Sequence, residues 1–262
     1  MASATKQLQN AGIATARLDC LVLLEDELGK DRAWLLAHPE CLISVSSFGH
    51  LHSEISQRAT HMPLAYIRGS VEFYGREFAV DTNTLVPRPE TEALVDVLKS
   101  LQLTRRTKLL DIGTGSGCIA ITAALELSAT DVSACDIDNR CLKVAERNAL
   151  TLGAHVTFFE SDLLKSVESA YDVLFANLPY VPNNYEINAA AMHEPSLALF
   201  GGADGLDLYR SLFDEIRQTL SKPTFVLTES LPSQHEKLTL IAKTASYNQI
   251  AVNDFIQLFE RD

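Results

Sequence analysis

The stretch LLDIGTGSGCIAI, residues 109–121, decides the fold class. It places Asp111 at the end of an apolar strand, followed by three alternating glycines and an apolar helix. Glycines in such a turn let the backbone reverse tightly and let a ligand lie against main-chain N–H groups. The spacing is GxGxG, not the GxGxxG of dinucleotide-binding proteins, and the preceding carboxylate disfavours a pyrophosphate. The turn therefore predicts a cationic cofactor without phosphate, a description that S-adenosylmethionine fits.

Short apolar runs alternate with helical stretches on both sides of this turn. The runs that predict buried strands are 108–113, 131–137, 155–160, 172–177 and 224–229, and the helical stretches are 117–127, 139–152, 205–220 and 233–243. Such alternation predicts a parallel, doubly wound α/β sheet. Residues 248–262 hold two further strand-like runs with a short link, which forces antiparallel pairing at a sheet edge.

The chain before residue 107 divides differently. Residues 1–64 contain only helical patterns, ending at Gly29, before Pro39 and before Pro63, and they predict a small helical bundle, for which the family resemblance given below implies substrate recognition. Residues 65–86 are rich in aromatic and β-branched residues around two glycines and predict a β-hairpin linker. The catalytic domain is expected to span residues 87–262.

Two further carboxylates follow successive strands. Asp136 ends the strand after the glycine turn, where a carboxylate can accept both ribose hydroxyl hydrogen bonds. Asp162 follows the next strand, where it can accept a hydrogen bond from an adenine amino group. Because ligands bind at the carboxyl edge of open α/β sheets, these acids and the glycines together predict a nucleoside site.

The fourth parallel strand delivers the tetrapeptide Asn177-Leu178-Pro179-Tyr180. An amide or amino-heterocycle nitrogen is a poor nucleophile because its lone pair is delocalised. The oxygen of Asn177 and the carbonyl next to Pro179 can accept both N–H groups of such a substrate and orient its lone pair, and Tyr180 can stack on a planar group. Asn177, Pro179 and Tyr180 are therefore the predicted catalytic residues, with Leu178 in the substrate-binding set. No metal is expected.

Composition limits the remaining possibilities. The chain has 262 residues, a net charge of −12 and 47% hydrophobic residues, which is typical of a globular protein and argues against nonspecific nucleic-acid binding. No apolar run is long enough for a membrane span, and the N-terminus is too polar for a signal peptide. The five scattered cysteines, without CxxC spacing, indicate a reduced, cytoplasmic protein. A monomer is expected.

Longer stretches of the chain resemble a known family. DIGTGSG, the acid of CDID and the Asn-x-Pro-Tyr tetrapeptide are similar to motifs of class I (Rossmann-like) methyltransferases that act on amino groups. Residues 63–96 and 193–210 and, more loosely, TESLPSQ (228–234) resemble the HemK/PrmC family. The resemblance implies a class I methyltransferase sheet with an antiparallel last strand and an N-terminal helical bundle. It also implies N5-methylation of the glutamine in the GGQ motif of peptide chain release factors.

The resemblance also assigns site residues. The implied cofactor contacts are Gly113, Thr114, Gly115, Ser116, Gly117, Asp136, Asp162, Leu163 and Asn177, and the implied substrate contacts are Asn177 to Tyr180. Two positions depart from the family pattern, which often has an aromatic residue at Leu163 and mostly a second proline at Leu178.

Two alternatives stay open. Asn-Leu-Pro-Tyr is also the form found in rRNA adenine dimethylases, so adenine-N6 methylation of rRNA is a second candidate, although that family adds a C-terminal helical domain. A degenerate protein that binds the cofactor without turnover is the third, and the departures at Leu163 and Leu178 are its support.

Overall fold

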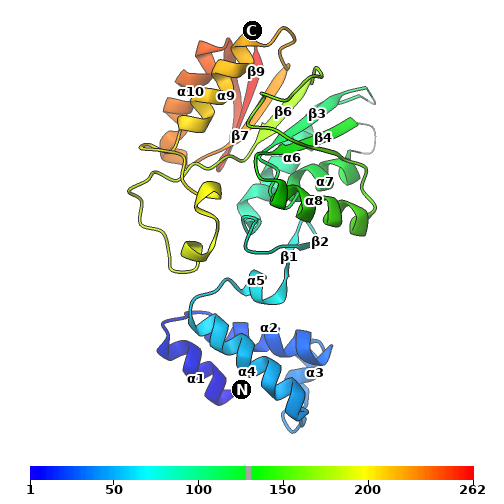
Figure 1. The fold of residues 1–262 in the computed structure, drawn as a ribbon, viewed down its shortest axis with the longest axis vertical. Helices are drawn as coiled ribbons and strands as arrows, with labels where there is room; N and C mark the ends of the chain where they lie inside the picture. The colour runs from blue at the N-terminus through cyan, green and yellow to red at the C-terminus, as the bar shows by residue number, and fades with distance from the viewer. Residues whose placement is uncertain (105, 128–130) are drawn as a thin grey trace. The chain divides into compact units, whose positions relative to one another are not determined.

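The computed structural model describes residues 1–104, 106–127 and 131–262. The chain forms two compact units (Figure 1). The first comprises Met1–Ser70 and Ile187–His193, and the second comprises Val71–Glu186 and Glu194–Asp262.

The first unit is a helical bundle. Its helices are α1 (Ala2–Asn10), α2 (Ala16–Leu28), α3 (Arg32–Ala37), α4 (Val45–Ala59) and α5 (Leu64–Arg68), with the short helix η2 at Ala191–His193. Gly29 ends α2 in a left-handed conformation, and the side chain of Asp31 accepts a hydrogen bond from Trp34 N at the start of α3. Helices α1, α2 and α4 bury a common apolar core, as expected for a bundle.

The second unit is built on a seven-stranded sheet of order β5-β4-β3-β6-β7-β9-β8. The strands are β3 (Lys108–Ile112), β4 (Asp131–Asp136), β5 (Thr157–Glu160), β6 (Val173–Ala176), β7 (Phe225–Glu229), β8 (Tyr247–Asn253) and β9 (Ile256–Arg261). β5, β4, β3, β6 and β7 are parallel, whereas β9 is antiparallel to both β7 and β8. The predicted doubly wound sheet with its antiparallel last strand is confirmed.

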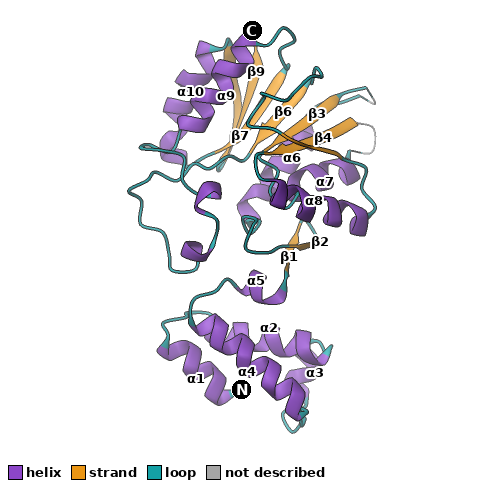
Figure 2. Ribbon diagram, in the orientation of Figure 1, coloured by secondary structure: helices purple, strands orange, loops and turns teal. Residues whose placement is uncertain are grey.

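Helices cover both faces of this sheet, so its central strands are apolar on both sides (Figure 2). One apolar cluster joins the sheet to α6 (Glu92–Ser100), α7 (Cys118–Glu126) and α8 (Asn139–Leu152). The other joins it to α9 (Asp207–Gln218) and α10 (His235–Thr244). The remaining elements are the hairpin strands β1 (Ser70–Phe73) and β2 (Arg76–Ala79) and the short helices η1 (Pro89–Thr91), η3 (Ser196–Ala198) and η4 (Pro232–Gln234).

The switch in strand order positions the site. In the sheet, β3 lies between β4 and β6. The chain adds β4 and β5 on one side of β3 and then crosses over to add β6 and β7 on the other side. The loops that leave the carboxyl ends of these strands diverge and leave a crevice, the usual ligand position in open α/β sheets. Within the described residues, no helix is long and apolar enough to cross a membrane.

Candidate active site

A cavity of about 200 Å³ lies at this crevice. Among the predicted site residues, its lining contains Gly113, Thr114, Gly115, Ser116, Asp136, Asp162, Leu163, Asn177, Leu178 and Pro179. Segments that are far apart in the sequence therefore meet at one site. The two predicted residues that do not line the cavity are Gly117 and Tyr180.

The glycine turn is held by hydrogen bonds to the neighbouring strand. The N–H groups of Gly113 and Thr114 both donate to the carbonyl of Cys135, at 2.9 and 3.0 Å. Gly113, Gly115 and Gly117 all have positive φ, which explains the alternating glycines. A Cβ on Gly117 would lie 2.9 Å from Ala145 Cβ, so this glycine allows α7 to pack closely on α8 and faces away from the cavity.

Two buried carboxylates flank the turn. Asp111 is fully buried, and burial raises its pKa to about 7, although the Thr114 hydroxyl donates to its Oδ2 at 2.7 Å. Its Oδ1 has no hydrogen-bond partner within the described part of the chain. Burial also raises the pKa of Asp136, which accepts hydrogen bonds from Gly115 N and Asp138 N, both at 2.9 Å. Two carboxylates in this environment favour a positively charged ligand.

The basic side chains of the lining are already paired. Arg88 forms an ion pair of 2.6 Å with Glu194, and Arg140 forms one of 2.6 Å with Asp138. A pyrophosphate would therefore compete with an existing carboxylate for either guanidinium. The buried carboxylates and the paired guanidinium groups of this site suit a nucleoside with a cationic centre better than a dinucleotide.

The wall formed after β4 and β5 is mainly apolar. Leu163 is buried and has a φ of +51°. It lines the cavity together with Ile137, whose side chain is about half exposed. Asp162 lies beside Leu163 and forms an ion pair with Lys165. Two aliphatic side chains can enclose a planar base without an aromatic partner. The sequence analysis missed Ile137, although it directly follows Asp136.

The tetrapeptide after β6 is anchored at each of its polar positions. Asn177 Nδ2 donates to Thr91 Oγ1 at 3.2 Å, and the N–H of Leu178 donates to the hydroxyl of Tyr209 at 3.2 Å. The Tyr180 hydroxyl donates to Glu229 Oε1 at 3.0 Å, which directs this side chain away from the cavity. The stacking role of Tyr180 stays a prediction.

A tight loop wraps the carbonyl side of the same tetrapeptide. Gln234 Nε2 donates to the carbonyls of Tyr180 and Asp204, both at 2.8 Å. A Cβ on Gly201 would lie 2.1 Å from the Pro179 oxygen, and one on Gly205 would lie 2.0 Å from the Tyr180 oxygen. Gly201, Gly205 and the glutamine of TESLPSQ are therefore explained by one task, which is to hold the tetrapeptide.

Replacing Gly205 by alanine is expected to destabilise the protein by about 1–3 kcal/mol, because the new methyl group would clash with backbone and the residue has a φ of +79°. Urea unfolding measures the change in the free energy of unfolding. Gly49→Ala is the matched control, since Gly49 lies in α4 with open space around its Cβ position. Equal stability of Gly205→Ala and the wild type would contradict this explanation of the loop.

The PRPETE stretch connects the hairpin, the sheet and the segment before α9. Glu92 Oε1 accepts the N–H of Tyr74 in the hairpin turn at 2.8 Å. Glu194 is almost fully buried, and besides Arg88 it binds the N–H of Val86 at 3.2 Å. These contacts give Arg88 and Glu92 a structural role in the second unit.

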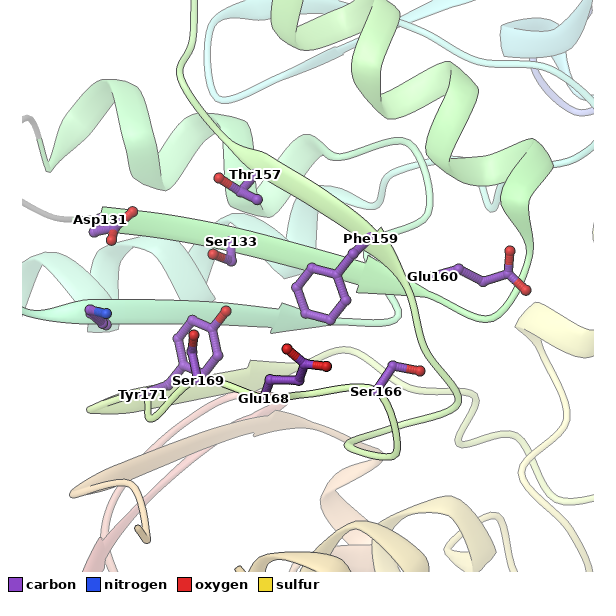
Figure 3. A pocket seen from close by; sticks show the side chains of 10 residues that line it. Asp131, Ser133, Thr157, Phe159, Glu160, Ser166, Glu168, Ser169 and Tyr171 are labelled. Carbon is purple, nitrogen blue, oxygen red and sulfur yellow. The ribbon is translucent and has the colours of Figure 1, made fainter.

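A second hollow, of about 450 Å³, lies on the face of β3, β4 and β5 (Figure 3). Figure 3 shows Ser133 and Thr157 on the strands and Ser166, Glu168 and Ser169 on the segment that precedes β6. It contains none of the predicted site residues. The first cavity, where the glycine turn and the tetrapeptide meet, is therefore the candidate active site.

The most informative residue missed by the sequence analysis is Glu229, a buried carboxylate at the end of β7. β6 and β7 are parallel neighbours with Ala176 paired to Thr228, so Glu229 stands beside Asn177 at the sheet edge. Its position at a strand end is the same signal that identified Asp136. Tyr209 and Thr91 gave no comparable signal.

Comparison with known families matches both units. Residues 1–69 match the PrmC N-terminal domain, and residues 89–194 match the methyltransferase small domain. A release factor glutamine methyltransferase of Koribacter versatilis is 38% identical, over 87% of this chain and 83% of that protein. One of Deinococcus radiodurans is 32% identical, over 94% of this chain and 90% of that protein.

Solved structures share the fold at low sequence identity. A methyltransferase from Pyrococcus furiosus has a TM-score of 0.54 at 20% identity, covering 72% of this chain and 90% of its own. A ribosomal protein L11 methylase from Lactobacillus delbrueckii has a TM-score of 0.52 at 19% identity, covering 70% and 84%. These similarities show that the chain has the same fold as these two methyltransferases.

Proposed function

Because this chain belongs to the family of release factor glutamine methyltransferases, we propose that it methylates a glutamine of a peptide chain release factor. The methyl donor is S-adenosylmethionine, and the acceptor is the side-chain amide nitrogen, N5, of the glutamine in the GGQ motif. The methyl–sulfur bond breaks, a carbon–nitrogen bond forms, and the nitrogen then loses a proton to solvent.

The glycine turn and its acids are proposed to hold the cofactor. Asp136 would accept hydrogen bonds from the ribose hydroxyls, since its carboxylate retains lone pairs beyond those used by Gly115 N and Asp138 N. Ile137 and Leu163 would enclose the adenine. When bound, the sulfonium supplies an activated methyl group, and its positive charge suits the buried carboxylates of Asp111 and Asp136.

The single observation that carries the proposed chemistry is the orientation of the Asn177 side-chain amide at the cavity. Its Nδ2 is engaged with Thr91, which leaves Oδ1 as the group offered to a ligand. The carbonyl of Leu178 is the second acceptor in the motif. Two acceptors that bind both N–H groups of a primary amide turn its nitrogen lone pair towards the methyl group and stabilise the charge that develops on nitrogen. No general base is required if the proton leaves after methyl transfer.

The direct test is mass spectrometry of a release factor after incubation with the protein and S-adenosylmethionine. We expect one added methyl group on the GGQ glutamine. Methylation of rRNA alone would support the adenine-N6 alternative, and cofactor binding without any transfer would support the degenerate one. Either outcome would overturn the proposed function.

The first unit is proposed to bind the release factor away from the reacting amide, so that remote contacts orient the glutamine. Its residues 1–69 match the PrmC N-terminal domain. The five cysteines are all free, which suits a reducing compartment, and we propose a cytoplasmic monomer that needs no nucleic acid.

Replacing Asp136 by alanine is expected to weaken S-adenosylmethionine binding ten- to a hundredfold, because charge-assisted hydrogen bonds to the ribose would be lost. Isothermal titration calorimetry gives the dissociation constant. Asp131→Ala, at the opposite end of β4, is the matched control and should bind normally. Unchanged affinity of Asp136→Ala would remove the ribose assignment.

A further inference from the structure

Glu229 is a buried carboxylate to which the proposed chemistry assigns no task. Glu229 is only 1% exposed, and its Oε1 accepts a hydrogen bond from the Tyr180 hydroxyl at 3.0 Å. Oε2 is buried and has no hydrogen-bond partner among residues 1–104, 106–127 and 131–262. The side chains that act on this carboxylate are those of Thr91, Tyr180, Asn177 and Glu90. Burial and, to a smaller extent, the charge of Glu90 raise its pKa, while the other three neighbours favour the charged form.

The amide of Asn177 has two orientations of nearly identical shape. Only one of them presents Oδ1 to a substrate amide; the other presents two N–H donors, which would repel the substrate N–H groups. Thr91 alone does not select between them, because a hydroxyl both donates and accepts. An ionised carboxylate only accepts, so it attracts the Nδ2 side of Asn177 and repels Oδ1.

We propose that Glu229 is a positioning residue, which with Thr91 fixes the Asn177 amide so that Oδ1 faces the reacting nitrogen. This inference rests on the proposed function and deepens it. Three separate stretches supply the arrangement: η1 supplies Thr91, the segment after β6 supplies Asn177, and the end of β7 supplies Glu229. It explains why this chain has a carboxylate at a buried position where a neutral residue would cost less free energy.

The first test is Glu229→Gln, which keeps the shape and an acceptor for Tyr180 but can now also donate to Asn177. We expect kcat to fall ten- to a hundredfold, with KM for the release factor and the dissociation constant of S-adenosylmethionine within twofold of the wild type. The melting temperature should not fall, because a buried charge has been removed. Glu160→Gln, an exposed strand-end glutamate of β5, should leave kcat unchanged. A kcat of Glu229→Gln within twofold of the wild type overturns the inference.

The second test reverses the sign of the effect. In an Asn177→Asp background both side-chain oxygens accept, so orientation no longer matters and Glu229 only repels its neighbour. Adding Glu229→Gln should then raise kcat several-fold, whereas a residue with a merely structural role would lower kcat in both backgrounds. A further loss in the double variant overturns the proposal. Absence of methylation by the wild type would instead refute the proposed function itself.

Discussion

Asn177→Ala is expected to slow methyl transfer to the release factor by a hundred- to a thousandfold, which is the usual loss when one preorganised polar contact to the reacting group is removed. The substrate amide would keep only the carbonyl acceptor, so its nitrogen lone pair would no longer be held towards the methyl group. The glycine turn is anchored on the carbonyl of Cys135, independently of Asn177. Cofactor affinity should therefore change little.

Single-turnover transfer of a tritiated methyl group measures this rate, and calorimetry measures cofactor binding on the same preparation. Asn253→Ala, an exposed residue at the end of β8, is the matched control. Near-normal turnover in Asn177→Ala would refute the role of Asn177. A loss of cofactor binding as large as the loss in rate would show that Asn177 acts through its implied cofactor contact and not on the substrate amide.

Asp111→Asn is expected to change how the stability of the free protein depends on pH. Burial raises the pKa of Asp111 from 3.8 to about 7, and the native state therefore binds a proton that the unfolded state releases between these values. The contribution of Asp111 to the free energy of unfolding is therefore fully present below pH 4, decreases as the pH rises and is lost above pH 7. The difference between the two pKa values corresponds to about 4 kcal/mol at most.

Urea unfolding of both proteins from pH 4.5 to pH 8 tests this effect. The free energy of unfolding of the wild type, minus that of Asp111→Asn, should fall across this range and become constant above about pH 7. Asp136 interacts electrostatically with Asp111 and also titrates with a raised pKa, but it is present in both proteins, so its contribution largely cancels. Parallel curves would show that Asp111 is ionised throughout. A cationic cofactor should reduce the change with pH in the difference between the two free energies of unfolding, because it stabilises the charged form of Asp111.

The fold could be predicted because each strand of the sheet is short, apolar and followed by a turn signal. Asp111 before Gly113, Asp136 and Asn177 all stand where a parallel strand ends, so knowledge of the sheet alone brings them to one edge. The antiparallel β9 followed from the short link after β8, which leaves no room for a crossover.

The remainder of the site depends on contacts that sequence spacing does not encode. Tyr209, in α9, reaches the tetrapeptide only because α9 packs against β6 and β7, and its hydroxyl lies 2.5 Å from the Glu229 carbonyl. Thr91 approaches Asn177 across 86 positions of the chain. Gly117 and Tyr180 fall within motifs whose other members line the cavity, and only the three-dimensional packing separates them.

The hydrogen bond from Leu178 to Tyr209 gives this chain an observable that a proline at the same position would remove. A buried main-chain amide exchanges its proton with solvent only when the surrounding structure opens. Leu178 thus carries an exchangeable proton inside the motif itself, next to the groups proposed to hold the substrate amide. Hydrogen–deuterium exchange at this one amide can report the free energy of opening of the site, with and without cofactor, and needs no substitution.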